Sequence, residues 1–290
     1  MDTMIKFADN MLADHFLTKE ELKKACPAAF KTEPTNPKVS DRYVQANTET
    51  VINDLEKLGW YPVQAKQCRI NKKSSGIRSL HMIAFQNPDV KIVKKGPDGS
   101  ETVDSWPRII LTNSHDGFNS FKFLLGMFRL VCSNGLIVGD TELVNMSVKH
   151  INYDFETLRD IVKTAIEQVP NIVCQMNAMK STILTDENKV ELAKNVVKIR
   201  KGIEDDEKFE IDEKTIMDIL DPMRKEDSAD DLWTVFNICQ EKMIKGEYYA
   251  TGANNKSRKQ RKITSIKKDI DFNQKLWAIA TNFITAKAVA

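Results

Sequence analysis

The fold of the first half of the chain is decided by residues 61–85, YPVQAKQCRINKKSSGIRSLHMIAF. Residues 61–70 and 77–85 are rich in apolar side chains of the kinds found in β-strands. The residues between them, NKKSSG, are polar and end in glycine, which favours a hairpin loop. We therefore predict that this segment begins an antiparallel sheet.

Further elements are predicted on both sides of this hairpin. Strands are expected at residues 90–93 and 108–112, with a strong turn signal, GPDG, at residues 96–99. Residues 48–58 predict a helix, because apolar side chains recur there at helical spacing and Gly59 favours its end. The first half is thus predicted to be a sheet of about four strands with a helix packed on it.

The second half is predicted to be helical. Apolar residues recur at helical spacing in residues 155–169, 186–199, 232–244 and 271–286. Ser228 or a nearby aspartate is expected to cap the third of these helices. Residues 202–213 are acidic and residues 248–261 are polar, so both are predicted to be loops, the second of them mobile.

The predicted class is therefore α+β, with an N-terminal antiparallel sheet, packed helices, and a helical C-terminal half. Ahead of the sheet, the TKEE sequence at residues 18–21 has the spacing of a capping box, and Pro27 should end that helix. Residues 31–40 contain two prolines and predict a linker. We divide the chain into an arm with its linker at 1–40, an α+β core at 41–150, and a helical region at 151–290.

Composition indicates a soluble globular protein, with 29% charged and 41% hydrophobic residues and a net charge of +2. The five cysteines form no CxxC pair, which argues against a zinc site and a disulfide framework. No stretch approaches the ~20 apolar residues of a membrane span, and the N-terminus does not resemble a signal peptide. We expect a cytoplasmic protein with reduced thiols and with no membrane partner, cofactor or metal.

The sequence His115-Asp116-Gly117 is the strongest candidate for chemistry. A histidine beside a carboxylate can serve as a general base or as part of a metal site. A metal-dependent hydrolase would need His115 to meet His81 or His150 together with carboxylates. The alternative is structural: Asn113, Ser114, His115 and Asp116 would form a hydrogen-bonded polar corner where a strand turns.

Arg129 is the second candidate, because it lies in a mostly apolar run at residues 121–138, where the only other charge is Lys122. A charged group in such a run should be paired or should face a ligand. Pairing with Asp116 or Asp140 is favoured over contact with an anion. Cys132 is disfavoured as a nucleophile, because no histidine is placed beside it in the sequence.

Two clusters of cations suit a phosphate backbone. The first lies on the predicted hairpin, where Trp60 and Tyr61 could stack on bases beside Lys66, Arg69, Lys72, Lys73 and Arg78. The second lies in residues 256–262 (KSRKQRK) and contains Arg258, Lys259, Arg261 and Lys262. The alternative for the second cluster is a solvated basic loop that balances the acidic residues 204–213.

The motifs NSHDG at residues 113–117 and RLVCSNGL at residues 129–136 resemble those of phage/plasmid-like proteins, a family of unknown function. Gly135 stands where the family pattern has threonine. The resemblance extends over residues 40–277 and implies a product of bacterial mobile elements, in the cytoplasm of a bacterial host cell. Six residues match the motif positions of the family, and the resemblance assigns no catalytic role to them: Asn113, His115, Asp116, Arg129, Cys132 and Asn134. The order of elements is also similar to that of single-strand annealing recombination proteins.

The sequence thus favours a non-enzymatic mobile-element protein that binds nucleic acid, with single-stranded DNA preferred, in replication, recombination or defence evasion. A protein-binding module, such as an inhibitor of host defence or a virion component, is the second hypothesis. A metal-dependent hydrolase is the third. The expected partner is therefore nucleic acid or a host protein, and self-association into a homo-oligomer is left open.

Overall fold

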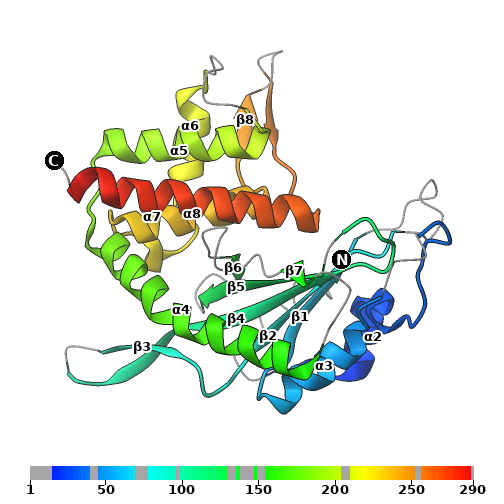
Figure 1. Cartoon of the computed structure of the whole chain (residues 1–290). Helices are drawn as coiled ribbons and strands as arrows, with labels where there is room; N and C mark the ends of the chain where they lie inside the picture. Colours follow the sequence, from blue (N-terminus) through cyan, green and yellow to red (C-terminus); the bar gives the residue numbers. More distant parts are fainter. Residues whose placement is uncertain are drawn as a thin grey trace. The chain divides into compact units, whose positions relative to one another are not determined.

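The computed structural model describes residues 15–39, 45–68, 78–95, 98–119, 121–129, 135–137, 147–148, 154–203, 210–251 and 256–288. The chain divides into two compact units, Met1–Val169 and Pro170–Ala290 (Figure 1). The first contains an antiparallel sheet and the second is mostly helical. The predicted α+β class is therefore confirmed.

The first unit is built on one antiparallel sheet in the order β1-β2-β4-β5-β6. These strands are β1 (Tyr61–Gln67), β2 (His81–Gln86), β4 (Glu101–Asn113), β5 (Phe121–Arg129) and β6 (Gly135–Ile137). Two short strands complete it: β3 (Ile92–Lys95) pairs with β4, and β7 (Ser147–Val148) pairs with β5. The predicted hairpin is present as β1 and β2, while its loop at residues 71–76 lies outside the described residues.

Strand β4 is longer than the predicted strand at residues 108–112. It begins at Glu101, which pairs with Lys95 across the turn signalled by GPDG. The first part of β4 therefore forms a hairpin with β3, while its second part lies between β2 and β5. Its apolar end is buried on both sides, and its N-terminal end is more polar, which concealed it in the sequence.

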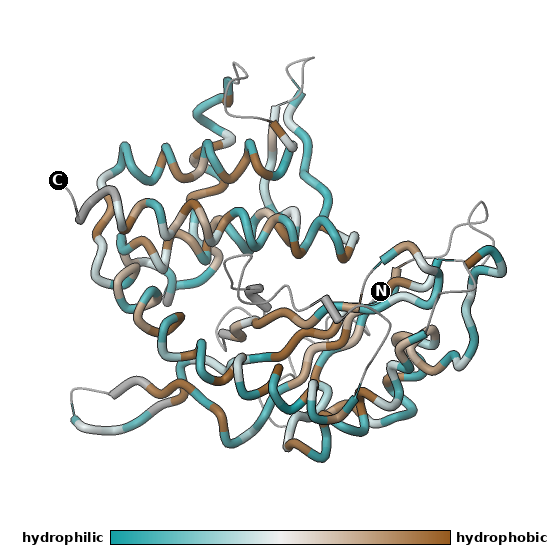
Figure 2. Tube along the Cα trace, viewed as in Figure 1, coloured by the Kyte–Doolittle hydropathy of each residue, from teal (hydrophilic) through white to brown (hydrophobic). Residues whose placement is uncertain are grey.

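Helices pack on the sheet as their caps and apolar faces dictate. They are α2 (Lys19–Ala25), the 3-10 helix η1 (Pro27–Phe30), α3 (Thr48–Lys57) and the first part of α4 (Phe155–Ser181). The predicted capping box is present, since the Thr18 hydroxyl accepts from Glu21 N (3.2 Å) and the Glu21 carboxylate accepts from Thr18 N (2.8 Å). Apolar residues of α3 and α4 form one core with residues of the strands. Figure 2 shows that the strands of the sheet are largely hydrophobic.

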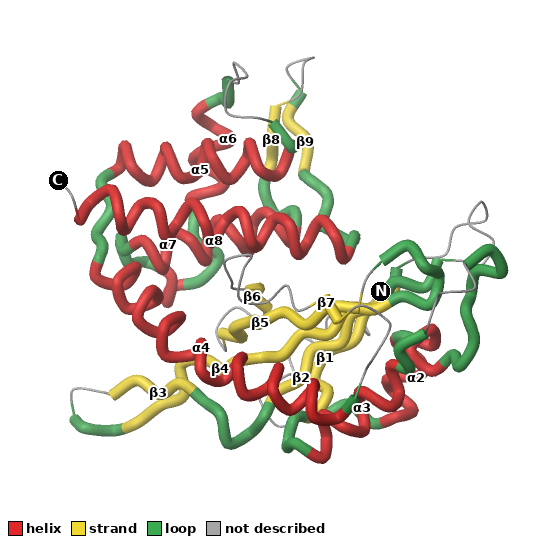
Figure 3. The backbone as a smooth tube through the Cα atoms, viewed as in Figure 1, coloured by secondary structure: helices red, strands yellow, loops and turns green. Residues whose placement is uncertain are grey.

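The second unit contains α5 (Asp186–Lys201), α6 (Glu213–Leu220), η2 (Lys225–Asp227), α7 (Leu232–Lys245) and α8 (Ile266–Ala288). A two-stranded hairpin, β8 (Tyr249–Thr251) and β9 (Ser257–Lys259), follows α7 (Figure 3). Three aromatic rings pack together in the core of this unit: Trp233 is stacked on Phe236 at 5.7 Å, and Trp277 meets both rings edge-on. Asp231 caps α7 by accepting from Thr234 N, as predicted for a nearby aspartate.

One expectation for the connecting segments needs correction. Residues 249–251 and 257–259 are strands rather than parts of a mobile polar loop, because they pair in register. Helix α6 was not predicted, since it is short and follows the acidic segment. The predicted linker is hydrogen-bonded to the first unit, because Thr35 N donates to the His115 carbonyl at 2.6 Å.

None of the described helices is both long enough and apolar enough to cross a lipid bilayer.

Candidate functional site

The first predicted cation cluster is only partly described. Lys66 is half-buried on β1, and Arg78 is exposed just before β2. Arg69, Lys72 and Lys73 lie outside the described residues. Their phosphate-binding role stays a prediction.

Trp60 does not have the role predicted for it. Gly59, with φ of +79°, reverses the chain after α3, and Trp60 N donates to the Leu55 carbonyl at 2.9 Å. The indole is consequently placed in the core and is only 1% exposed, so it cannot stack on a base. Tyr61 is 36% exposed, with its ring 4.9 Å from that of Phe16.

The NSHDG motif forms a buried polar corner at the end of β4. Asn113, Ser114, His115 and Asp116 are all fully buried. The Asp116 carboxylate accepts from Ser114 Oγ (2.6 Å), Ser79 N (3.0 Å) and Phe118 N (3.0 Å). Burial opposes ionisation of this carboxyl, but these hydrogen bonds outweigh burial and hold its pKa below the ordinary value. The structure thus agrees with the interpretation of the motif as a polar corner.

His81 and His115 meet in this corner, with ring centroids 5.3 Å apart, and share one hydroxyl. Thr48 Oγ1 lies 2.9 Å from His81 Nε2 and 3.2 Å from His115 Nε2. Thr48 Oγ1 also accepts from Asn113 Nδ2 at 2.9 Å. The hydroxyl has a single proton, so it donates to only one of the two rings.

The hydrogen bonds at Nδ1 of each imidazole show which ring accepts the Thr48 proton. His81 Nδ1 is 2.8 Å from the Ser79 carbonyl, so it carries a proton and His81 Nε2 is the acceptor. His115 Nδ1 faces the Gln45 amide nitrogen at 3.3 Å, and this nitrogen also donates to the Lys31 carbonyl. His115 therefore carries its proton on Nε2 and donates to Thr48. Both nitrogens of each ring are therefore hydrogen-bonded to other groups of the protein.

This arrangement makes the first unit sensitive to acid. Burial lowers the pKa of His81 from 6.5 to about 4. The unfolded chain therefore binds a proton that the folded chain excludes, and stability falls as the pH drops from 6.5 towards 4. We expect a loss of roughly 3 kcal/mol over this range. Urea titrations followed through the NMR signals of β2 and β4 measure it. Substitution of the exposed His15 by glutamine should leave the loss unchanged, whereas an equal loss in His81→Asn would contradict its assignment to His81.

The hydrolase hypothesis gains no support from the described residues. His81 and His115 do meet, but the Asp116 carboxylate is directed to Ser79, Ser114 and Phe118. Across the described ranges, no group of three His, Cys, Asp or Glu side chains is arranged to hold a metal ion. Arg129 ends β5 opposite Ser105, and its side chain, Cys132 and Asn134 lie outside the described part.

The second predicted cation cluster is fully described. Arg258 and Lys259 lie on β9, Arg261 and Lys262 follow it, and all four residues are exposed. None of the four has a carboxylate partner among the residues that the structure describes. The cluster therefore presents positive charge that the described part of the chain does not neutralise.

An exposed aromatic ring accompanies these cations, and sequence reasoning missed it. Tyr249 on β8 is paired with Lys259 on β9, and its side chain is 51% exposed. Residues directly opposite in an antiparallel pair have side chains on the same face, about 5 Å apart at Cβ. The hairpin thus places the side chains of Tyr249 and Lys259 on one face. The alternation in YYAT was the available signal, but it is too short to stand out.

The backbone of this basic segment is fixed to the end of α7. Gly246 ends the helix with φ of +69°, and a Cβ there would lie 2.4 Å from Arg261 C and 2.6 Å from Lys262 N. Ile263 N donates to the Ile244 carbonyl at 2.8 Å, and Arg200 Nη2 donates to the Arg261 carbonyl at 2.6 Å. The cations therefore extend from an ordered backbone.

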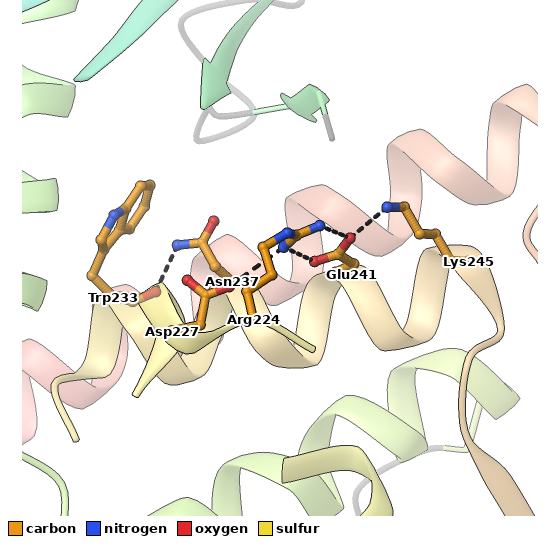
Figure 4. Close-up of polar contacts among 6 residues, drawn as sticks. All are labelled: Arg224, Asp227, Trp233, Asn237, Glu241 and Lys245. Atoms are coloured by element: carbon orange, nitrogen blue, oxygen red, sulfur yellow. Dashed lines mark hydrogen bonds and ion pairs between the residues drawn. The ribbon is translucent and has the colours of Figure 1, made fainter. Parts of the chain in front are cut away.

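A buried carboxylate on α7, that of Glu241, forms ion pairs with two cations (Figure 4). Glu241 is 2% exposed and accepts from both terminal nitrogens of Arg224, each at 2.5 Å. Lys245 also pairs with it, and Arg224 reaches Asp227 at 3.4 Å. Burial opposes ionisation of Glu241, but the hydrogen bonds and charges of Arg224 and Lys245 hold its pKa below the ordinary value. Glu241 thus has its charge balanced within the unit by two partly exposed cations.

Comparison with known proteins places the chain in a family. The family described as a domain of unknown function, DUF932, matches residues 37–277. The chain belongs to the DUF932 family. The resemblance to a family of unknown function is thereby confirmed, while its origin in phages and plasmids stays a prediction.

Two curated relatives of this DUF932 protein come from Escherichia coli (strain K12). UPF0380 protein YfjQ is 30% identical over 94% of this chain and 93% of its own length. UPF0380 protein YafZ is 29% identical with the same coverage of both chains. No solved structure matches the chain significantly. The DUF932 match includes both the buried corner and the β8–β9 hairpin.

Proposed function

We propose that this DUF932 protein binds nucleic acid, with single-stranded DNA preferred, through the β8–β9 hairpin. The observation that carries the proposal is the set of exposed, unneutralised cations at Arg258, Lys259, Arg261 and Lys262. Cations on an ordered backbone bind phosphates at a smaller entropic cost than those on a mobile loop.

The preference for a single strand rests on Tyr249. Its ring is half exposed on the face that also presents Lys259. A base can stack on such a ring only when it is unpaired and turned outward, and stacking of this kind is tolerant of sequence. A ring and a cation on one face thus suit a base and its phosphate together.

The test is a double charge reversal, Arg258→Glu with Lys259→Glu. For a single strand, the slope of log Kobs against log salt is about −0.7 for each phosphate contact, so two lost contacts should flatten it by about 1.4. Binding to a thymidine oligomer at low salt should weaken by more than about tenfold. Fluorescence anisotropy at several salt concentrations measures both effects.

The matched control is Lys194→Glu with Lys225→Glu, which changes the net charge equally at two exposed lysines of the same unit. It should leave the salt slope unchanged. Equal weakening by both pairs of substitutions would show that only net charge matters, and absence of binding by the unaltered protein would refute the proposal. The proposed setting is replication, recombination or defence evasion in a bacterial mobile element.

A further inference from the structure

A second exposed ring lies on the first unit, beside the buried corner. Phe118 follows the NSHDG motif and is 55% exposed, which is unusual for a phenylalanine. The Arg78 guanidinium carbon lies 4.8 Å from the centre of this ring. Arg78 is itself exposed. A cation and an aromatic ring thus lie together at the surface.

The buried corner fixes the backbone on both sides of this pair. Asp116 accepts from Ser79 N through one carboxylate oxygen and from Phe118 N through the other, each at 3.0 Å. Ser79 is the neighbour of Arg78, so one carboxylate holds the two chain segments that carry the cation and the ring. The Ser79 hydroxyl adds a further link by accepting from His115 N at 2.8 Å.

The surrounding turn is shaped to bring Phe118 out of the core. Gly117 has φ of +74°, and a Cβ there would lie 3.0 Å from Val39 Cγ1. The chain therefore reverses at Gly117, leaving Asp116 buried and Phe118 outside. Asp116 and Ser79, which position Phe118, are fully buried, whereas the ring itself is 55% exposed.

We propose that Phe118 and Arg78 form a second nucleotide contact, in which the ring stacks on a base and the guanidinium binds a phosphate. This inference rests on the proposed function and extends it to the first unit. A guanidinium over an aromatic ring keeps its charge and its N–H donors, so both groups remain able to bind. The ligand class is single-stranded nucleic acid, because a paired base offers no free face.

The test compares two oligomers of about 20 nucleotides, longer than the usual site of one single-strand-binding domain. One is a thymidine oligomer, and the other has the same backbone with abasic positions throughout. Phe118→Leu keeps an apolar side chain but removes the ring. It should weaken binding of the thymidine oligomer by about fivefold or more and leave the abasic oligomer unchanged. Arg78→Gln should weaken both.

The matched control is Val93→Ala, which trims another exposed apolar side chain of the first unit. It should change neither affinity. If the protein binds and the hairpin reversal weakens binding as expected, but Phe118→Leu has no effect on the thymidine oligomer, the inference fails while the proposed function stands. If Phe118→Leu weakens both oligomers equally, the ring has no stacking role and the inference also fails. Circular dichroism checks that each variant is folded.

Discussion

Replacement of Gly246 by alanine is expected to destabilise the second unit by about 3 kcal/mol. The added Cβ would lie within 2.7 Å of three backbone atoms, in Gln260, Arg261 and Lys262. Backbone cannot move aside as a flexible side chain can, so the segment that carries the cations must shift. Alanine also disfavours the φ of +69° at this position. Thermal unfolding and oligomer binding should therefore both change.

Gly202 provides a close control for this prediction. It ends α5 with φ of +70°, but a Cβ there would have no atom within 4 Å among the described residues. Gly202→Ala should lower the stability by only about 1 kcal/mol, because alanine disfavours the positive φ but meets no steric clash. DNA affinity should be unchanged. If the two variants lose equal stability, the predicted clash between the added Cβ and the backbone of residues 260–262 does not affect stability.

Replacement of Glu241 by glutamine should cost about 3 kcal/mol, because it leaves Arg224 and Lys245 without their shared anion in a buried site. The sign of the pH dependence follows from the lowered pKa of Glu241. A carboxyl that is more acidic in the folded chain stabilises it above the ordinary value of 4.5, and this contribution is lost as the pH falls below that value. The variant should lack this loss. Chemical denaturation at pH 7 and pH 4 measures both effects.

The control is Asp271→Asn, which removes an ion pair of the same spacing on α8. Asp271 and Lys275 are 3.1 Å apart, with side chains 59% and 57% exposed. Exposed pairs of this kind contribute about 0.5 kcal/mol or less. A Glu241→Gln variant no less stable than Asp271→Asn would show that the buried network adds nothing to stability.

The regular elements could be predicted because apolar spacing and caps are local signals. The helix after Asn47 ends one residue before the predicted position, and the capping box at Thr18 is present. Helix α4 is present as predicted from Phe155 but continues through Pro170 to Ser181, beyond the predicted end at residue 169. The short strands β8 and β9 could not be predicted, because three residues carry too little periodicity.

The sequence predicted the cations of the candidate site but not its exposed aromatic side chains. The cations at residues 258–262 are a composition signal, and they are exposed in the structure. Aromatic side chains give no such signal, since a ring beside cations in the sequence can enter the core. Trp60 is buried, whereas Tyr249 and Phe118 are exposed. The backbone turns at Gly59 and Gly117, which the aromatic residues themselves do not signal, set the directions of Trp60 and Phe118.

The single hydroxyl proton of Thr48 links the N-terminal segment to the sheet. If His81 were to exchange its tautomer, Thr48 could no longer donate to it, and His115 would have to move its own proton to Nδ1. That nitrogen would then oppose the Gln45 amide, whose other bond holds the Lys31 carbonyl. Loss of the hydrogen bond between Gln45 and His115 and rearrangement of two imidazoles should consequently occur as one event, visible in the nitrogen-15 chemical shifts of both rings.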